Sequence, residues 1–206
     1  IGGISVPPAS IGVNSFTVTL KNETDKWVGP VATLGLKWPE KGSLRILDQE
    51  ISIQPGEEVK RTYEYELPTP DAPTMTFSLL WPKQTPLPVL AERTFAPSVL
   101  QPLTMAVRPR TYYLSETLGA AEFKLDLAPS MLKSARLILA LYNADETKML
   151  RQFDISPLEG NRLTAMLNLR GLPEGSYRLW AVLDDAEGTR ISERSARIER
   201  FRGPFD

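Results

Sequence analysis

The sequence predicts an all-β protein built from two similar halves. Apolar and polar residues alternate along many short runs, which is the pattern of strands with one buried face. Pro and Gly residues separate these runs and mark turns. A short pattern also occurs twice, about a hundred residues apart. Ile53-Gln54-Pro55 leads to Leu67-Pro68, and Ile155-Ser156-Pro157 leads to Leu172-Pro173. This repetition favours two copies of one small domain.

Each half contains enough alternating runs for a complete sandwich. In the first half we expect strands at 4–6, 16–21, 33–38, 44–47, 59–67, 76–81 and 89–95. In the second half we expect them at 105–107, 112–114, 123–127, 135–142, 149–155, 163–169, 177–183 and 190–198, with one helical turn at 129–134. About seven short strands in about 100 residues are typical of an immunoglobulin-like sandwich. The sequence therefore predicts two tandem immunoglobulin-like β-sandwich domains, residues 1–100 and 101–206.

Composition excludes several kinds of chemistry. The 206 residues include neither Cys nor His, which excludes Cys-based zinc sites, Cys nucleophiles, Ser-His-Asp triads and histidine bases. The formal net charge of −1 gives no electrostatic reason to expect nucleic acid. No stretch approaches the roughly 20 apolar residues of a membrane-spanning helix. We expect no enzyme activity, no cofactor, no bound metal, no nucleic-acid partner and no membrane insertion.

Two short motifs resemble known modules. The segment from Leu172 to Tyr177, with Gly175 between, resembles the tyrosine corner of fibronectin type III and related bacterial immunoglobulin-like domains. In that corner, the buried tyrosine hydroxyl donates a hydrogen bond to an upstream backbone group. The turn from Gln54 to Val59 resembles that of CARDB-like modules. The resemblance implies a non-catalytic accessory module of the kind attached to secreted glycoside hydrolases, located outside the cell, in the periplasm or on the cell surface.

One sheet face of the second half is predicted to be unusually apolar. If Tyr177 and Leu179 point inward, the intervening positions point outward. Together with the neighbouring strand, these form an outward set that consists of Ile138, Ala140, Tyr142, Trp180 and Val182. A solvated sheet is normally polar on its outer face, so this set suggests a contact surface. Closure by the protein's own loops and a small-molecule site are the alternatives.

Tryptophans of the first half form the second candidate site. Trp38 and Trp81 share the alternation of core residues, whereas Trp27 lies in a polar segment between two strands. The loops that carry Trp27 and follow Trp81 are expected at one tip of the sandwich, where the two rings would form an aromatic platform for a glycan or protein ligand. The alternative is that Trp27 folds back over the edge of the core. Acidic side chains at 57–58 and 184–187 are expected to be solvated turn charges, although turn carboxylates also bind Ca²⁺.

The functional prediction is an accessory or spacer module of a larger secreted or surface bacterial protein. It would pack against a neighbouring domain of the same polypeptide, a carbohydrate-active catalytic domain, and would be an excerpt of that longer chain. The competing prediction is an adhesion or protein-binding module that uses the same apolar face in trans.

Overall fold

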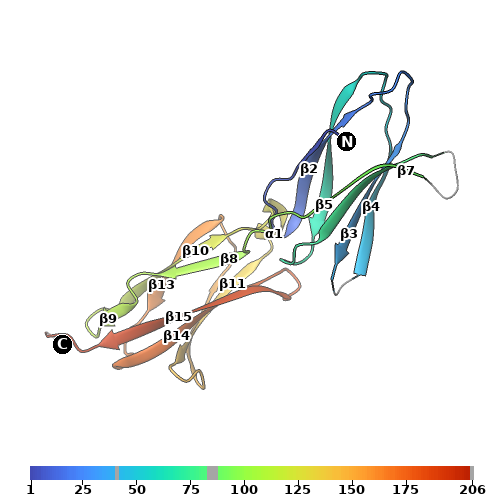
Figure 1. The fold of residues 1–206 in the computed structure, drawn as a ribbon. Helices are drawn as coiled ribbons and strands as arrows, with labels where there is room; N and C mark the ends of the chain where they lie inside the picture. Colours follow the sequence, from blue (N-terminus) through green and yellow to red (C-terminus); the bar gives the residue numbers. More distant parts are fainter. Residues whose placement is uncertain (40–41, 83–87, 205–206) are drawn as a thin grey trace. The chain divides into compact units, whose positions relative to one another are not determined.

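The computed structural model describes residues 1–39, 42–82 and 88–204 and confirms an almost entirely β protein (Figure 1). The first eight elements along the chain are the strands β1 (Gly3–Ser5), β2 (Gly12–Lys21), β3 (Val31–Trp38), β4 (Gly42–Glu50), β5 (Glu58–Leu67), β6 (Thr74–Leu80), β7 (Val89–Phe95) and β8 (Leu103–Val107). They are followed by β9 (Thr111–Tyr113), β10 (Leu118–Leu125), the single-turn helix α1 (Pro129–Leu132), β11 (Arg136–Asn143), β12 (Met149–Ile155), β13 (Arg162–Asn168), β14 (Gly175–Asp184) and β15 (Arg190–Phe201).

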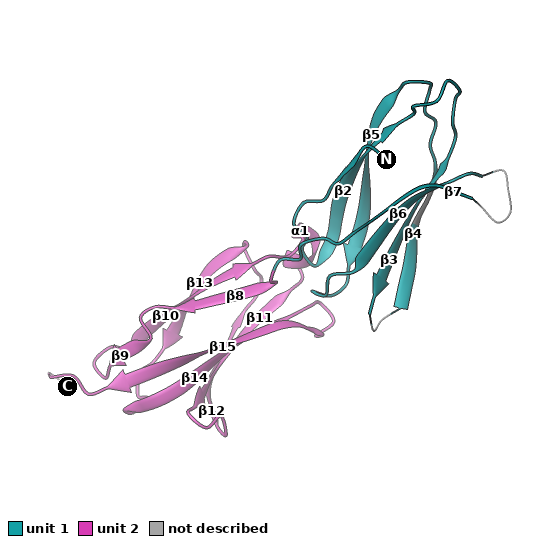
Figure 2. Ribbon diagram, viewed as in Figure 1, with its two compact units in different colours: residues 1–100 teal, residues 101–206 magenta. Residues whose placement is uncertain are grey.

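The chain divides into two compact units, residues 1–100 and 101–206 (Figure 2). The last residues of the first unit belong to it through backbone hydrogen bonds. The Ala9 amide donates to the Ser98 carbonyl, and the Leu100 amide donates to the Ala9 carbonyl. Residues 98–100 therefore run alongside Ala9 in the first unit.

The first unit consists of two antiparallel sheets with the strand orders β1-β2-β5 and β4-β3-β6-β7. The alternation in β2 places Phe16, Val18 and Leu20 in the core, while the intervening threonines lie outside it. Phe16 contacts rings from both sheets, with centroids 5.6 Å from Tyr63 on β5 and 6.0 Å from Phe77 on β6. This aromatic cluster joins the two layers, and burial of the rings stabilises the unit.

The second unit has sheets with the orders β13-β10-β8 and β12-β11-β14-β15-β9. All pairs are antiparallel except β15 with β9, which is parallel. The sandwich core is built from inward residues of both sheets, including Leu137, Leu139, Leu179 and Phe123. Because β8 and β9 belong to different sheets, the chain crosses from one sheet to the other between them.

The repeated sequence pattern occupies equivalent places in the two units. In the first, Ile53 to Leu67 contains β5, which pairs with β2. In the second, Ile155 to Leu172 contains β13, which pairs with β10. In each copy the chain leaves one sheet and forms an edge strand of the other sheet. In the described part of the chain, no helix is long and apolar enough to cross a membrane.

Candidate functional site

The predicted apolar face lies on β11 and β14, two neighbouring inner strands of the five-stranded sheet. Ile138 pairs with Val182 and Ala140 pairs with Trp180 across β11 and β14. Tyr142 extends the row and pairs with Arg178. All five apolar residues are half-buried. We call Ile138, Ala140, Tyr142, Trp180 and Val182 the apolar face.

A polar rim borders the apolar face on both sides. On β12, Gln152 lies opposite Ala140 and Asp154 lies opposite Ile138. The Arg136 Nη2 donates to Asp154 Oδ2 at 2.5 Å, and this hydrogen bond lowers the pKa of the Asp154 carboxyl from its ordinary value. On the other side, β15 supplies a serine and a glutamate opposite Trp180 and Val182. An apolar centre with a polar rim is the anatomy of a protein interface.

The indole of Trp180 is held in place by the hairpin between β11 and β12. Trp180 Nε1 donates to Glu146 Oε2 at 2.8 Å, and Arg178 Nε lies 3.2 Å from Glu146 Oε1. Glu146 has a φ of 60°, an uncommon conformation for a non-glycine residue, and it brings the carboxylate back over the sheet. One loop of the chain therefore contacts Trp180, and all five residues of the apolar face remain partly exposed.

The structure places Trp27 and Trp81 on one cavity of the first unit. This tryptophan cavity has a volume of about 400 Å³ and is lined by Trp27, Gly29, Glu50, Ile51, Ser52, Trp81 and Pro82. Trp81 directly follows β6 and is half-buried, so it is less enclosed than a core residue. Trp38 is such a residue: it is 7% exposed, and its Nε1 donates to the Asp71 carbonyl at 3.2 Å.

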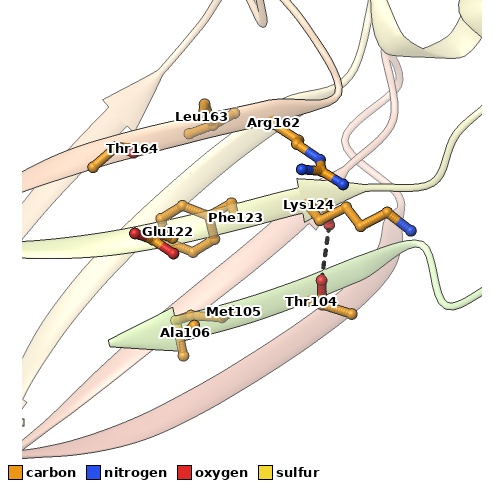
Figure 3. A pocket seen from close by; sticks show the side chains of 9 residues that line it. All are labelled: Thr104, Met105, Ala106, Glu122, Phe123, Lys124, Arg162, Leu163 and Thr164. Atoms are coloured by element: carbon orange, nitrogen blue, oxygen red, sulfur yellow. Dashed lines mark hydrogen bonds between the residues drawn. The ribbon is translucent and has the colours of Figure 1, made fainter. Parts of the chain in front are cut away.

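A second hollow of about 410 Å³ lies over the three-stranded sheet of the second unit (Figure 3). Lys124 on β10 lies directly opposite Arg162 on β13, and both side chains extend toward the same end of the hollow (Figure 3). Like charges in such a pair repel each other. Asp126 offsets this repulsion, because its Oδ2 lies 2.7 Å from Lys124 Nζ. With Glu122 also on the lining, positive and negative charges balance, and this hollow has no net attraction for an anion.

The acidic turns use their carboxylates to shape the backbone. Asp185 Oδ1 accepts hydrogen bonds from the amides of Glu187 and Thr189, at 3.0 and 2.7 Å. Glu57 Oε2 accepts one from the Gln54 amide at 2.7 Å. Among the described residues, no group of three or more acidic side chains is arranged to hold a metal ion.

The tyrosine corner has the geometry that the sequence resemblance implies. The Tyr177 hydroxyl donates to the Pro173 carbonyl at 2.6 Å, and the residue is only 5% exposed. Burial raises the pKa of this hydroxyl, and the charge of Arg200 opposes the rise. The bond fixes the chain where it enters β14, which carries Trp180 and Val182.

Sequence reasoning missed the buried Arg200. It is 2% exposed, and its guanidinium donates to the carbonyl oxygens of Leu169, Tyr113, Leu114 and Glu116. Arg200 thus ties the segment after β9 to the segment after β13 at one end of the sandwich. Its place in the inward alternation of Ala196 and Ile198 is the sequence signal, but a charged residue there is normally read as solvent-facing.

Comparison with known proteins yields resemblance to solved structures alone. No family model matches the chain, and no curated protein matches it. Red sea bream transglutaminase is similar over 98% of this chain and 31% of its own, with a TM-score of 0.46 and 12% identity. The chicken interferon gamma receptor alpha chain is similar over 96% of both chains, with a TM-score of 0.45 and 8% identity. The chain spans about a third of the transglutaminase. At these TM-scores neither likeness carries an argument about this chain.

Proposed function

We propose that this chain is a non-catalytic accessory module of a larger secreted or surface bacterial protein, and that the apolar face packs against a neighbouring domain of that polypeptide. The two units are, in this proposal, tandem immunoglobulin-like domains. Each has a three-stranded sheet opposite a larger sheet, in which β3 and β6 or β11 and β14 are neighbouring inner strands. The tyrosine corner at Tyr177 supports this assignment for the second unit.

The observation that carries the proposal is the apolar face itself. Its centre is a tryptophan whose indole is fixed by Glu146 and Arg178, so little side-chain freedom is lost when a partner covers it. Tryptophan is enriched among the residues that dominate binding energy at protein interfaces. The polar rows on β12 and β15 would remain at the edge of the contact. The sequence resemblance to modules of secreted glycoside hydrolases suggests a carbohydrate-active domain as the neighbour.

Self-association of the 206-residue chain tests whether the apolar face is a contact surface. A face normally covered by another domain should bring two copies together when that domain is missing. We expect the sedimentation coefficient to rise with protein concentration. The variant Val182→Lys should sediment as a monomer, because the lysine places a charge on the apolar face.

Thr164→Lys is the matched control, since Thr164 is exposed on β13 in the opposite sheet. This variant should associate as the unsubstituted chain does. A chain that stays monomeric at every concentration, with Val182→Lys indistinguishable from it, would contradict the proposal. Specific capture of a separate protein by the isolated chain, lost in Val182→Lys, would instead support an adhesion module that acts in trans.

A further inference from the structure

The tryptophan cavity belongs to the first unit and has no part in the proposed contact of the second. Its most exposed aromatic residue is Trp27, which is 49% exposed. An exposed tryptophan is not by itself a site. Three further features of this cavity set it apart: a rigid loop, a fixed indole and a carboxylate without a partner.

The loop that carries Trp27 is organised by the buried Asn22, which is 3% exposed. Asn22 Nδ2 donates to the carbonyls of Lys26 and Ile53, at 2.8 and 3.1 Å. Its Oδ1 accepts from both the amide and the hydroxyl of Thr24. Val28 and Ile53 then exchange backbone hydrogen bonds of 3.1 and 3.0 Å. These hydrogen bonds hold the loop in place on both sides of Trp27. The backbone at the cavity is therefore ordered without a ligand.

The indole of Trp27 is seated at both ends. Its Nε1 donates to Ser52 Oγ at 2.7 Å. Its six-membered ring lies on Gly29, where a Cβ would come within 2.6 Å of Cη2 and 2.9 Å of Cζ2. Since no side chain larger than hydrogen fits beneath the ring, Gly29 is required for this orientation. The result is a flat aromatic surface that is half exposed and held in one position.

Trp81 and Pro82 supply the other apolar part of the lining. The two indoles line the same cavity but do not form a stacked or edge-to-face pair like those around Phe16. They are separate surfaces, which suit a flat ligand longer than one ring. A compact cation would instead need aromatic rings gathered closely around it.

Glu50 is the charged residue of the lining. It is exposed at the end of β4, and in the described part of the chain its carboxylate makes neither a hydrogen bond nor an ion pair. A carboxylate with two free oxygens is an acceptor for several hydroxyl groups. Glu50 and the Ser52 hydroxyl therefore supply polar partners beside the aromatic surfaces. An apolar cavity with a few placed polar groups is the usual composition of a small-molecule site, and about 400 Å³ lies in the usual size range.

We propose that the tryptophan cavity binds a neutral oligosaccharide of at least two sugar rings. The C–H faces of the sugars would lie on the indoles of Trp27 and Trp81, where the electron-rich ring faces attract them. Hydroxyl groups at the sugar edges would donate to Glu50. This combination of apolar ring faces and hydroxylated edges is the chemistry of a sugar ring.

The test uses the 206-residue chain labelled with 5-fluorotryptophan, titrated with cello-, xylo-, manno-, malto- and chito-oligosaccharides. The chain has four tryptophans, so fluorine NMR reports each of them separately. We expect saturable shifts of the Trp27 and Trp81 signals with at least one of these sugars. The Trp38 and Trp180 signals should stay in place, because one is buried in the core and the other lies in the second unit.

Two variants probe the mechanism of binding. Gly29→Ala should weaken binding by roughly tenfold or more, since the methyl group displaces the indole without removing any group that touches the sugar. Gly35→Ala is the matched control, because its Cβ would meet only the Thr76 carbonyl at an ordinary 4.0 Å. Glu50→Gln should weaken binding by only a few-fold, as an amide oxygen still accepts from hydroxyls.

Several results would overturn the proposal. One is the absence of saturable shifts with every oligosaccharide in the series. Another is equal binding by Gly29→Ala and Gly35→Ala, which would mean that the position of the Trp27 indole does not matter for sugar binding. Tight binding of tetramethylammonium that Glu50→Gln abolishes, without sugar binding, would assign the cavity to cations. None of these results bears on self-association through the apolar face, so the two proposals fail separately.

Discussion

The hydroxyl of Tyr177 provides a direct measure of what holds the second unit together. Tyr177→Phe removes one oxygen and leaves the ring in its place, so packing hardly changes. The lost interaction is the 2.6 Å hydrogen bond to the Pro173 carbonyl, in a residue that is 5% exposed. Because the folded unit then loses a hydrogen bond made by a buried side chain, we expect the free energy of unfolding of the second unit to fall by about 1–3 kcal/mol. With a urea slope of about 2 kcal/mol/M, the midpoint should drop by about 1 M.

Urea titration of the 5-fluorotryptophan chain reads both units in one sample. Trp180 is the tryptophan of the second unit, and Trp38 reports the core of the first. The Trp180 midpoint should move in Tyr177→Phe, and the Trp38 midpoint should not. Tyr113→Phe serves as the control, since Tyr113 is 53% exposed and should shift neither signal. An unchanged Trp180 midpoint in Tyr177→Phe would refute the assignment of a tyrosine corner.

Three further predictions follow from buried polar groups. Tyr63→Phe and Tyr65→Phe should leave the stability of the first unit unchanged or raise it by about 1 kcal/mol. The reason is that, within the described residues, these buried hydroxyls have no hydrogen-bond partner. A loss of stability in urea titration would reveal a missed partner. Arg200→Met should destabilise the second unit by about 3 kcal/mol or more, since it leaves four carbonyls without their donor. An unchanged urea midpoint of the Trp180 signal would show that Arg200 is dispensable. Burial raises the pKa of Tyr63, Tyr65 and Tyr177, so each stays protonated in the folded chain at a pH where it ionises in the unfolded chain. The free energy of unfolding should therefore be at its full value below about pH 10 and fall above it. Urea titrations across that pH range would check this.

Much of the fold could be predicted from the sequence because alternation reports directly on burial. The run from Phe16 to Leu20 has its apolar residues in the core and its threonines outside. The expected strand at 149–155 has the bounds that the structure gives β12. Alternation says less about burial where a strand ends. Trp81 continues the alternation of β6 but follows its last residue, so it lies at the tip of the sandwich and lines a cavity.

The candidate sites divide along the same line. The outward direction of Trp180 and Val182 follows from the inward direction of Leu179, so the apolar face could be predicted by counting. The groups that hold the indoles of Trp180 and Trp27 in place could not be predicted in this way. Glu146 reaches Trp180 from a position 34 residues away, and Ser52 reaches Trp27 from one 25 residues away. Such contacts depend on loop conformation, which the alternation of strand residues does not encode.

Hydroxyl-radical footprinting of Trp180 tests the proposed role most directly. Its modification rate would be measured in the 206-residue chain and in the full polypeptide that its gene encodes. If a neighbouring domain covers the apolar face, Trp180 and Tyr142 should be modified several-fold more slowly in the full polypeptide, while exposed Tyr113 serves as the internal reference. Equal rates for Trp180 in both, or a gene product no longer than this chain, would contradict the account.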